Sequence, residues 1–260
     1  MYCSFYGLRE RPFENNPDPR FLYLGEAHRE ALAQLLYGVQ QRKGFIVLTG
    51  EVGTGKTTLL RALLERLDPG VRTALVFNPL LSREEFFRLI WDEFELPGSF
   101  EDKAEFLVRL NAFLLELYRR GESALLIVDE AQGLSAELLE EVRLLLNLET
   151  SGGKLLQIVL AGQPELRHKL DLPQLRQLRQ RVSLNYHLRP LGRRDTEAYV
   201  RRRLRVAGCA GEGPFEARAL REVHRLSGGI PRLINLLCDH ALLLGYALGL
   251  WHLLRLFPTI

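Results

Sequence analysis

Hydrophobic positions between residues 26 and 190 follow two alternating patterns. Short apolar runs stopped by a glycine or a polar residue are typical of buried strands, and they occur at 45–49, 71–77, 124–129, 155–161 and 182–188. Longer segments with apolar residues three and four positions apart are typical of amphipathic helices. Such helices are predicted at 26–41, 58–67, 82–94, 102–119 and 135–148, with one or two short ones at 164–180.

The alternation of strands and helices predicts βαβ units, and therefore a five-stranded parallel sheet with helices on both faces. After Pro190 the pattern changes to helices alone, at 193–207, 214–226 and 230–250. Residues 1–25 are rich in proline, asparagine and aromatic residues, which predicts an arm held by contacts rather than a helix. We therefore expect an N-terminal arm at 1–25, an α/β domain at 26–190 and a small all-helical lid at 191–260.

Composition adds few constraints to this picture. The 260 residues are 47% hydrophobic and 26% charged, with a formal net charge of +3, which is an ordinary balance for a globular chain. Cys3, Cys209 and Cys238 lie far apart without zinc or C-x-x-C spacing, so a reduced, cytoplasmic compartment fits best. The apolar segment 241–257 is interrupted by His252 and Arg255, and we favour a buried last helix over one that meets lipid.

A phosphate-binding motif joins the first predicted strand to the helix after it. The pattern G-x-x-x-x-G-K-[ST] is matched at every fixed position. Its glycines let backbone N–H groups cradle phosphate oxygens, and the N-terminus of the following helix points at the same anion. Lys56 would reach the β- and γ-phosphates, and Thr57 would offer its hydroxyl to Mg²⁺. The motif predicts that ATP binds with Mg²⁺ at Gly50, Glu51, Val52, Gly53, Thr54, Gly55, Lys56, Thr57 and Thr58.

Two carboxylates, Asp129 and Glu130, end the third predicted strand. Parallel α/β sheets bind ligands at the carboxyl ends of their strands, so both side chains are expected at that edge. Asp129 would hold Mg²⁺, and Glu130 would orient and activate the attacking water. The alternative is that the pair merely ends a strand, and the P-loop elsewhere in the chain makes us favour hydrolysis.

The P-loop, the two carboxylates and the helical lid together resemble the AAA+ ATPases, which have the P-loop NTPase fold. Over about residues 1–240 the chain looks more specifically like the general secretion pathway protein A (ExeA-like) family. The segments that carry this resemblance are Phe5-Tyr6-Gly7-Leu8, Pro12-Phe13, Pro17-Asp18-Pro19-Arg20-Phe21-Leu22-Tyr23, His28-Arg29-Glu30-Ala31-Leu32, Asp129-Glu130-Ala131-Gln132, Ala161-Gly162-Gln163-Pro164-Glu165-Leu166 and Gly228-Gly229-Ile230-Pro231-Arg232-Leu233-Ile234-Asn235.

The resemblance implies roles for several further residues near the nucleotide. Gln163 falls in the sensor-1 region, where AAA+ proteins place a polar residue near the γ-phosphate. Asn78 falls where many relatives restrain the catalytic glutamate, although a turn-forming asparagine is an equal interpretation. Arg232, in the Gly-Ile-Pro-Arg turn, matches sensor 2. The alternative of a surface arginine is disfavoured, because a positive charge at a helix N-terminus opposes the helix dipole and suggests an anionic partner. The adenine is then expected between the arm, near Phe21, Leu22 and His28, and the lid, near Ile230 and Pro231.

The same resemblance implies an arginine finger donated by a neighbouring subunit. The candidates are Arg176, Arg179 and Arg181, and we favour Arg181 because it lies just before the fifth predicted strand. A second arginine cluster lies in the lid, and it could contact phosphate backbone or anionic lipid, although we favour a solvated helix face. Its members are Arg193, Arg194, Arg201, Arg202, Arg203 and Arg205.

We therefore expect an oligomeric, Mg²⁺-dependent ATPase, cytoplasmic or peripheral at the inner membrane. Its partner would be a membrane-associated secretion or pilus-assembly protein. One alternative is a DNA-associated regulator of the transposition type, and another is a nucleotide-dependent switch with little turnover. Members of the family usually continue into a transmembrane helix and a peptidoglycan-binding region, which we do not expect within these 260 residues.

Overall fold

The computed structural model of the chain describes residues 1–15, 18–77 and 81–253, and it contains two compact units. The sheet unit comprises Ala31–Gly50 and Leu59–Leu188. The arm–lid unit comprises Met1–Glu30, Glu51–Thr58 and the chain from Arg189 onwards. The P-loop after Gly50 therefore groups with the arm and the lid, although it continues directly from a strand of the sheet unit.

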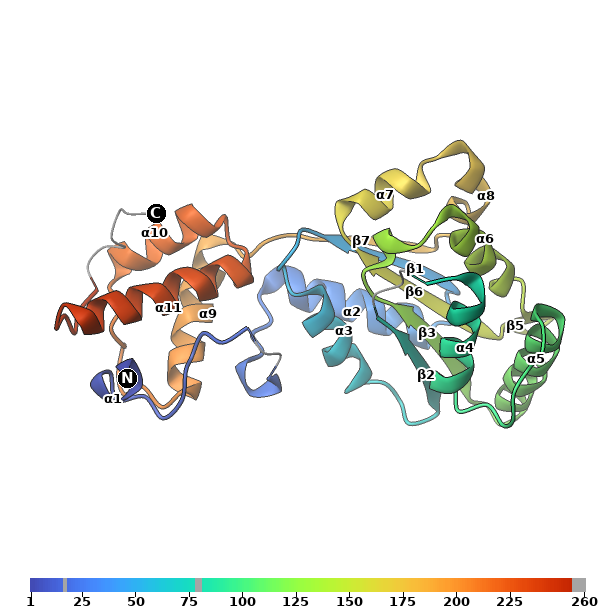
Figure 1. Cartoon of the computed structure of the whole chain (residues 1–260), viewed down its shortest axis with the longest axis horizontal. Helices are drawn as coiled ribbons and strands as arrows, with labels where there is room; N and C mark the ends of the chain where they lie inside the picture. Colours follow the sequence, from blue (N-terminus) through green and yellow to red (C-terminus); the bar gives the residue numbers. More distant parts are fainter. Residues whose placement is uncertain (16–17, 78–80, 254–260) are drawn as a thin grey trace. The chain divides into compact units, whose positions relative to one another are not determined.

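The sheet unit is built on a five-stranded sheet in which every neighbouring pair is parallel (Figure 1). The strand order is β2-β3-β6-β1-β7, so the chain crosses over repeatedly, as the alternating pattern predicts. Because all five strands run the same way, their carboxyl ends share one edge. The strands are β1 (Phe45–Gly50), β2 (Val71–Val76), β3 (Ser123–Val128), β6 (Leu156–Gly162) and β7 (Leu184–Leu188).

Helices cover both faces of this sheet. α4 packs against β2, α5 against β3 and α7 against β1, while α2 and α3 lie on the opposite side from α4 and α5 (Figure 1). The capping box predicted at Ser82 is present, with Glu85 as its reciprocal partner. The helices are α2 (Glu26–Gln40), α3 (Lys56–Leu64), α4 (Arg83–Glu93), α5 (Lys103–Arg119), α6 (Ala136–Leu145), α7 (Pro164–Leu170) and α8 (Arg176–Arg179), with 3-10 turns η2 (Ala131–Gly133) and η3 (Pro173–Leu175).

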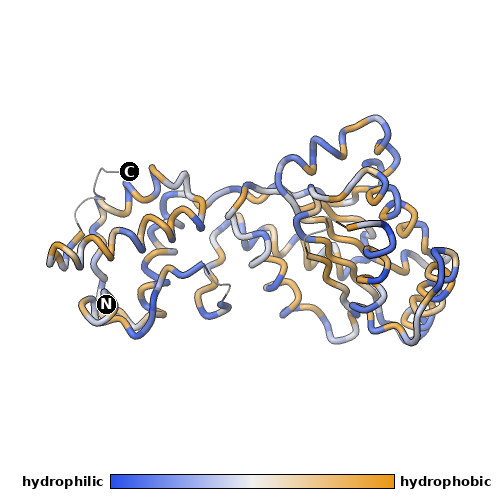
Figure 2. Tube along the Cα trace, in the orientation of Figure 1, coloured by the Kyte–Doolittle hydropathy of each residue, from blue (hydrophilic) through white to orange (hydrophobic). Residues whose placement is uncertain are grey.

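The central strands consist mostly of hydrophobic residues (Figure 2), and these are buried, as a sheet covered on both sides requires. Every residue of β1 and of β6 is buried. The sequence analysis did not predict a small antiparallel hairpin, β4 (Glu149–Thr150) with β5 (Gly153–Lys154), because two-residue strands are too short to show a hydrophobic periodicity. The predicted helix also extends to residue 67, whereas α3 ends at Leu64 because the N–H groups of Arg66 and Leu67 bond to carbonyls only three residues earlier.

The arm–lid unit joins the first residues of the chain to the last helices. Its helices are α1 (Tyr2–Phe5), α9 (Arg193–Val206), α10 (Ala217–Ser227) and α11 (Pro231–Ala247), with the 3-10 turn η1 (Pro19–Phe21). The arm is therefore partly helical, and the prediction of no helix before residue 26 was wrong. Tertiary contacts place these short turns, because the Tyr2 hydroxyl donates to Asp239 of α11 and Tyr6 is 1% exposed in the lid core.

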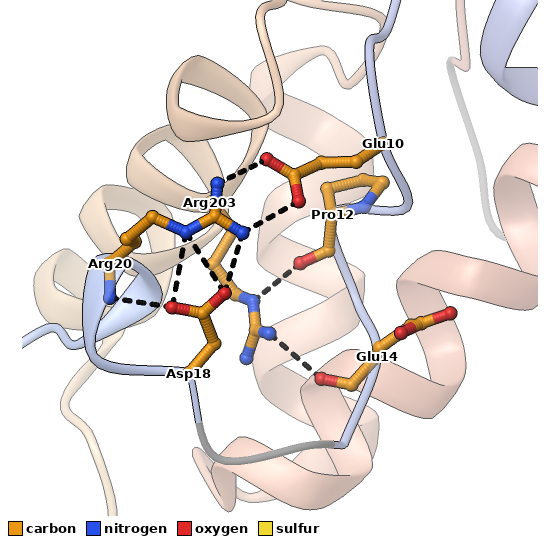
Figure 3. A network of polar contacts seen from close by, with 6 residues as sticks. All are labelled: Glu10, Pro12, Glu14, Asp18, Arg20 and Arg203. Carbon is orange, nitrogen blue, oxygen red and sulfur yellow. Dashed lines mark hydrogen bonds and ion pairs between the residues drawn. The ribbon is translucent and has the colours of Figure 1, made fainter.

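Arg203 anchors the arm to α9 from inside the arm–lid unit (Figure 3). Its Nε donates to the Pro12 carbonyl at 2.5 Å and its Nη2 donates to the Glu14 carbonyl at 2.8 Å. The guanidinium lies 4.9 Å from the ring centroid of Phe21, and the residue is only 6% exposed. The solvated-face prediction for the lid arginines is therefore wrong at Arg203, whereas Arg193, Arg194, Arg202 and Arg205 are exposed.

None of the helices formed by residues 1–15, 18–77 and 81–253 has the length and apolar character needed to cross a membrane.

Candidate active site

The P-loop has the backbone shape that its glycines predict. Gly53 and Gly55 have φ of 78° and 97°, in the left-handed region that side chains disfavour. A Cβ at Gly53 would lie 2.6 Å from the Cβ of Arg232, so the loop and the start of α11 approach too closely for any other residue. Substitution of Gly53 would therefore disturb both the loop and its contact with the lid.

The carbonyl of Glu51 organises the interior of this loop. It accepts hydrogen bonds from the Thr54 N–H at 3.3 Å and from the Thr54 hydroxyl at 2.8 Å. The Lys56 ammonium donates to the same oxygen at 3.1 Å, and Lys56 is 5% exposed. The loop thus folds around its own lysine. The Lys56 ammonium bonds to the loop backbone whose N–H groups are expected to bind phosphate.

His28, at the start of α2, supports the loop from the side of the arm. Its Nε2 lies 2.9 Å from the Thr54 carbonyl, and because a carbonyl only accepts, Nε2 must carry the proton. Nδ1 has no hydrogen-bond partner in the part of the chain that the structure describes. Burial lowers the pKa of His28 below 6.5, so the ring is neutral at neutral pH. A neutral imidazole with an unused acceptor therefore stands beside the P-loop.

Arg232, the predicted sensor-2 residue, lies beside the P-loop within the same unit. Its backbone N–H donates to the Gly53 carbonyl at 3.3 Å, and it occupies the first turn of α11 after Pro231. Ile230 is also close, with its Cγ2 3.3 Å from a Cβ built on Gly53. Phe21, expected near the adenine, is instead packed in the core of the arm–lid unit beneath Arg203.

In the sheet unit, the two predicted carboxylates follow β3. Asp129 is 1% exposed, and its Oδ1 accepts from the Glu130 N–H at 2.9 Å. Glu130 has φ 53° and ψ 33°, a left-handed conformation that is rare for a residue other than glycine. Such outliers concentrate at functional sites, because the surrounding structure must hold them in place. The sharp turn directs the two carboxylates differently, although they are neighbours in sequence.

Two glutamine amides converge on Glu130. Gln163, the predicted sensor-1 residue after β6, donates from Nε2 to Glu130 Oε2 at 3.3 Å. Gln132, in η2, donates from Nε2 to the same oxygen at 2.6 Å. The structure therefore brings Gln163 and Gln132 together at Glu130, and the sequence analysis assigned no role to Gln132.

A family model described as an AAA domain matches residues 39–170 of the 260-residue chain, and this half of the chain contains the P-loop and both carboxylates. The chain belongs to the AAA domain family. It is also 50% identical over 250 residues to general secretion pathway protein A of Aeromonas hydrophila, which confirms the narrower resemblance. That alignment covers 96% of this chain but only 46% of the relative, so the chain spans less than half of the relative's length.

Solved structures with the same AAA fold are more distant in sequence. Cdc6p from Pyrobaculum aerophilum has a TM-score of 0.67 at 20% identity, over 90% of this chain and 67% of that one. The Aeropyrum pernix ORC2 protein in its ADP form has 0.65 at 20% identity, over 94% and 69%. Domain III of the Thermotoga maritima replication initiation protein DnaA has 0.56 at 19% identity, over 94% of both chains. These similarities confirm the predicted fold.

The remaining residues predicted for an AAA site lie apart from the P-loop in sequence. Arg181 precedes β7, and its Nη1 is 3.4 Å from the Leu146 carbonyl. Arg179 pairs with Asp171 at 2.8 Å, and Arg176 is exposed at the start of α8. Asn78, the predicted restraint on Glu130, lies outside the described residues. Among the described residues, the amides that contact Glu130 belong to Gln132 and Gln163.

Proposed function

We propose that this AAA-domain chain binds ATP with Mg²⁺ and hydrolyses it. The observation that carries the proposal is the P-loop, where two glycines in left-handed conformations and a buried Lys56 surround one short stretch of backbone. Backbone N–H groups of this loop and the N-terminus of α3 would hold the phosphates, and the Lys56 ammonium would exchange the Glu51 carbonyl for phosphate oxygens.

The other residues supply the remaining parts of phosphoryl transfer. The Thr57 hydroxyl and the Asp129 carboxylate are hard oxygen donors of the kind that Mg²⁺ takes, so the donor set fits this ion. Bound Mg²⁺ would offset the charge that develops on the phosphate oxygens. Glu130 would orient the attacking water and accept its proton. Arg232, beside Gly53, would reach the phosphates from α11 and link the lid to the nucleotide.

Lys56→Ala is expected to weaken ATP binding at least about tenfold and to reduce turnover further, because a buried charge-assisted contact to phosphate is lost. Binding is measured by calorimetry and turnover by phosphate release, with Mg²⁺ and with excess EDTA. Lys43→Ala, an exposed lysine at the opposite end of β1, is the matched control. Unchanged affinity of Lys56→Ala for ATP would contradict the proposed role of the P-loop. Turnover of ATP in excess EDTA would contradict the proposed role of Mg²⁺.

We also propose that hydrolysis takes place at an interface between copies of the chain, with Arg181 as the finger and Arg179 as the next candidate. In a mixture of Arg181→Ala and Lys56→Ala subunits, some interfaces combine an intact P-loop with an intact arginine. We expect turnover of the mixture to exceed that of either variant alone. A mixture no more active than its components, or a chain that sediments as a monomer with ATP present, would contradict this part of the proposal.

The 50% identity to general secretion pathway protein A supports a proposal about the pathway. We propose a cytoplasmic ATPase, located at the inner membrane, that assists assembly or operation of a secretion, pilus or export system through a membrane-associated partner. Neighbouring genes for such a system would support this, whereas transposase genes would favour a DNA-associated regulator. Burial of Arg203 removes one member of the basic cluster on which the DNA alternative depends. Steady turnover would exclude a simple nucleotide switch.

A further inference from the structure

We propose that Gln132 is a positioning residue for Glu130, a role that rests on the proposed ATP hydrolysis. Its side chain bridges two segments that are distant in sequence. Nε2 donates to Glu130 Oε2 at 2.6 Å, and Oε1 accepts from the backbone N–H of Gln163 at 3.0 Å. Gln132 therefore ties the turn after β3 to the residue that follows β6.

The orientation of this amide is set by its partners. A backbone N–H only donates, so it must face the amide oxygen, and a carboxylate only accepts, so it must face the amide nitrogen. Reversing the amide would place an oxygen against the Glu130 carboxylate and an NH₂ group against the Gln163 N–H. Both contacts would then be repulsive, so the chemistry fixes one rotamer of Gln132.

The surrounding structure makes room for Gln132 and holds its backbone. A Cβ at Gly162 would lie 2.7 Å from Gln132 Oε1, so a side chain at this position would displace the amide. Lys169 of α7 donates from Nζ to the carbonyls of Gln132 and Leu134 at 2.6 and 2.7 Å. These hydrogen bonds connect α7 to η2 and hold the Gln132 backbone in place, so that its side-chain amide stays beside Glu130.

The two glutamine contacts distinguish the two carboxylate oxygens of Glu130. Gln132 and Gln163 both donate to Oε2, which fixes the plane of the carboxylate. Oε1 is then the oxygen offered to the attacking water, and the left-handed backbone at Glu130 sets the direction in which it points. Among the described residues, removing Gln132 leaves the carboxylate with the longer bond from Gln163, and its orientation becomes less defined.

Gln132→Ala is expected to lower kcat for ATP hydrolysis by roughly ten- to a hundredfold, because small displacements of a catalytic group have effects of this size. KM for ATP and the thermal midpoint are expected to stay near wild type. Gln132→Glu keeps the shape but faces Glu130 with a second carboxylate, so its kcat should fall at least as far. Gln40→Ala, an exposed glutamine at the end of α2, is the control and should match wild type.

Two double-variant cycles separate positioning from a general structural effect. Adding Gln132→Ala to Glu130→Gln should cost no further activity, since the residue acts through Glu130. Gly162→Ala should lower kcat alone, and should cost less when Gln132 is already alanine. Wild-type kcat in both Gln132 variants, or additive losses with Glu130→Gln, would overturn the inference while leaving the ATPase intact. A wild-type chain without turnover would overturn the proposed function and this role together.

Discussion

Replacing Glu130 with glutamine is expected to lower ATP turnover by roughly 10²- to 10⁴-fold, the usual contribution of a positioned general base. The amide keeps the size and the hydrogen-bonding length of the side chain but does not accept the proton of the attacking water. ATP affinity should remain near wild type, because the P-loop that holds the phosphates is unchanged. Single-turnover phosphate release and equilibrium nucleotide binding together check both halves of this expectation.

The chain offers a close control for this variant. Glu95, at the end of α4, is an exposed glutamate with φ of 54°, so it shares the unusual backbone conformation of Glu130. Glu95→Gln should turn over ATP like wild type, which separates the chemistry of the carboxylate from the strain of the turn. Normal turnover in Glu130→Gln would place the base elsewhere, and lost ATP binding would mean that the substitution disturbs the fold.

Replacing Arg203 with alanine is expected to destabilise the arm–lid unit by about 2–4 kcal/mol. The substitution leaves the carbonyls of Pro12 and Glu14 without their buried donors. It also removes the hydrogen bond of 2.7 Å from Nη1 to the Tyr199 hydroxyl and the stacking of the guanidinium on Phe21. Urea denaturation followed by tyrosine fluorescence, with limited proteolysis of the arm, measures the effect.

Two companion variants show whether the loss is specific to the guanidinium. Arg203→Lys should recover less than half of the stability, because one ammonium does not reproduce a planar fork with donors in several directions. Arg205→Ala changes an exposed arginine of the same helix and should stay within about 0.5 kcal/mol of wild type. If Arg203→Ala unfolds like Arg205→Ala, the arm is held by its aromatic residues and the polar network is incidental.

The sequence was sufficient to predict the fold where local patterns determine the structure. The central strands β1, β3 and β6 are buried and mostly apolar runs, so their positions were predictable and are confirmed, and the P-loop motif carries its own backbone requirements. The lid arginines could not be predicted in this way. The sequence of α9 is typical of a solvated helix, but in the structure the arm, which is distant in sequence, covers part of it. Arg203 differs from Arg205 only in the partners that the fold brings to it.

The polar environment of Glu130 was predictable only in part. Gln163 was expected near the γ-phosphate from the resemblance to AAA+ proteins, whereas the contact of Gln132 with Glu130 depends on the parallel pairing of β3 with β6. That pairing brings the ends of the two strands together, and no local pattern around Gln132 reports it. The left-handed backbone conformation of Glu130 was likewise not predictable, because it is caused by the turn into η2 and not by the conformational propensity of glutamate.

The shared core of the arm and the lid has a consequence for the order of events during synthesis. Tyr2 and its partner Asp239 are separated by 237 positions, and the ribosome makes the first long before the second. At about 5–20 residues per second, the apolar face of the arm waits roughly 10–50 s for the helices that cover it. The sheet unit has a complete set of strands by Leu188 and can fold in that interval. In the cell, the arm is therefore made well before the lid helices that cover it, and a chaperone would meet it while it is still uncovered.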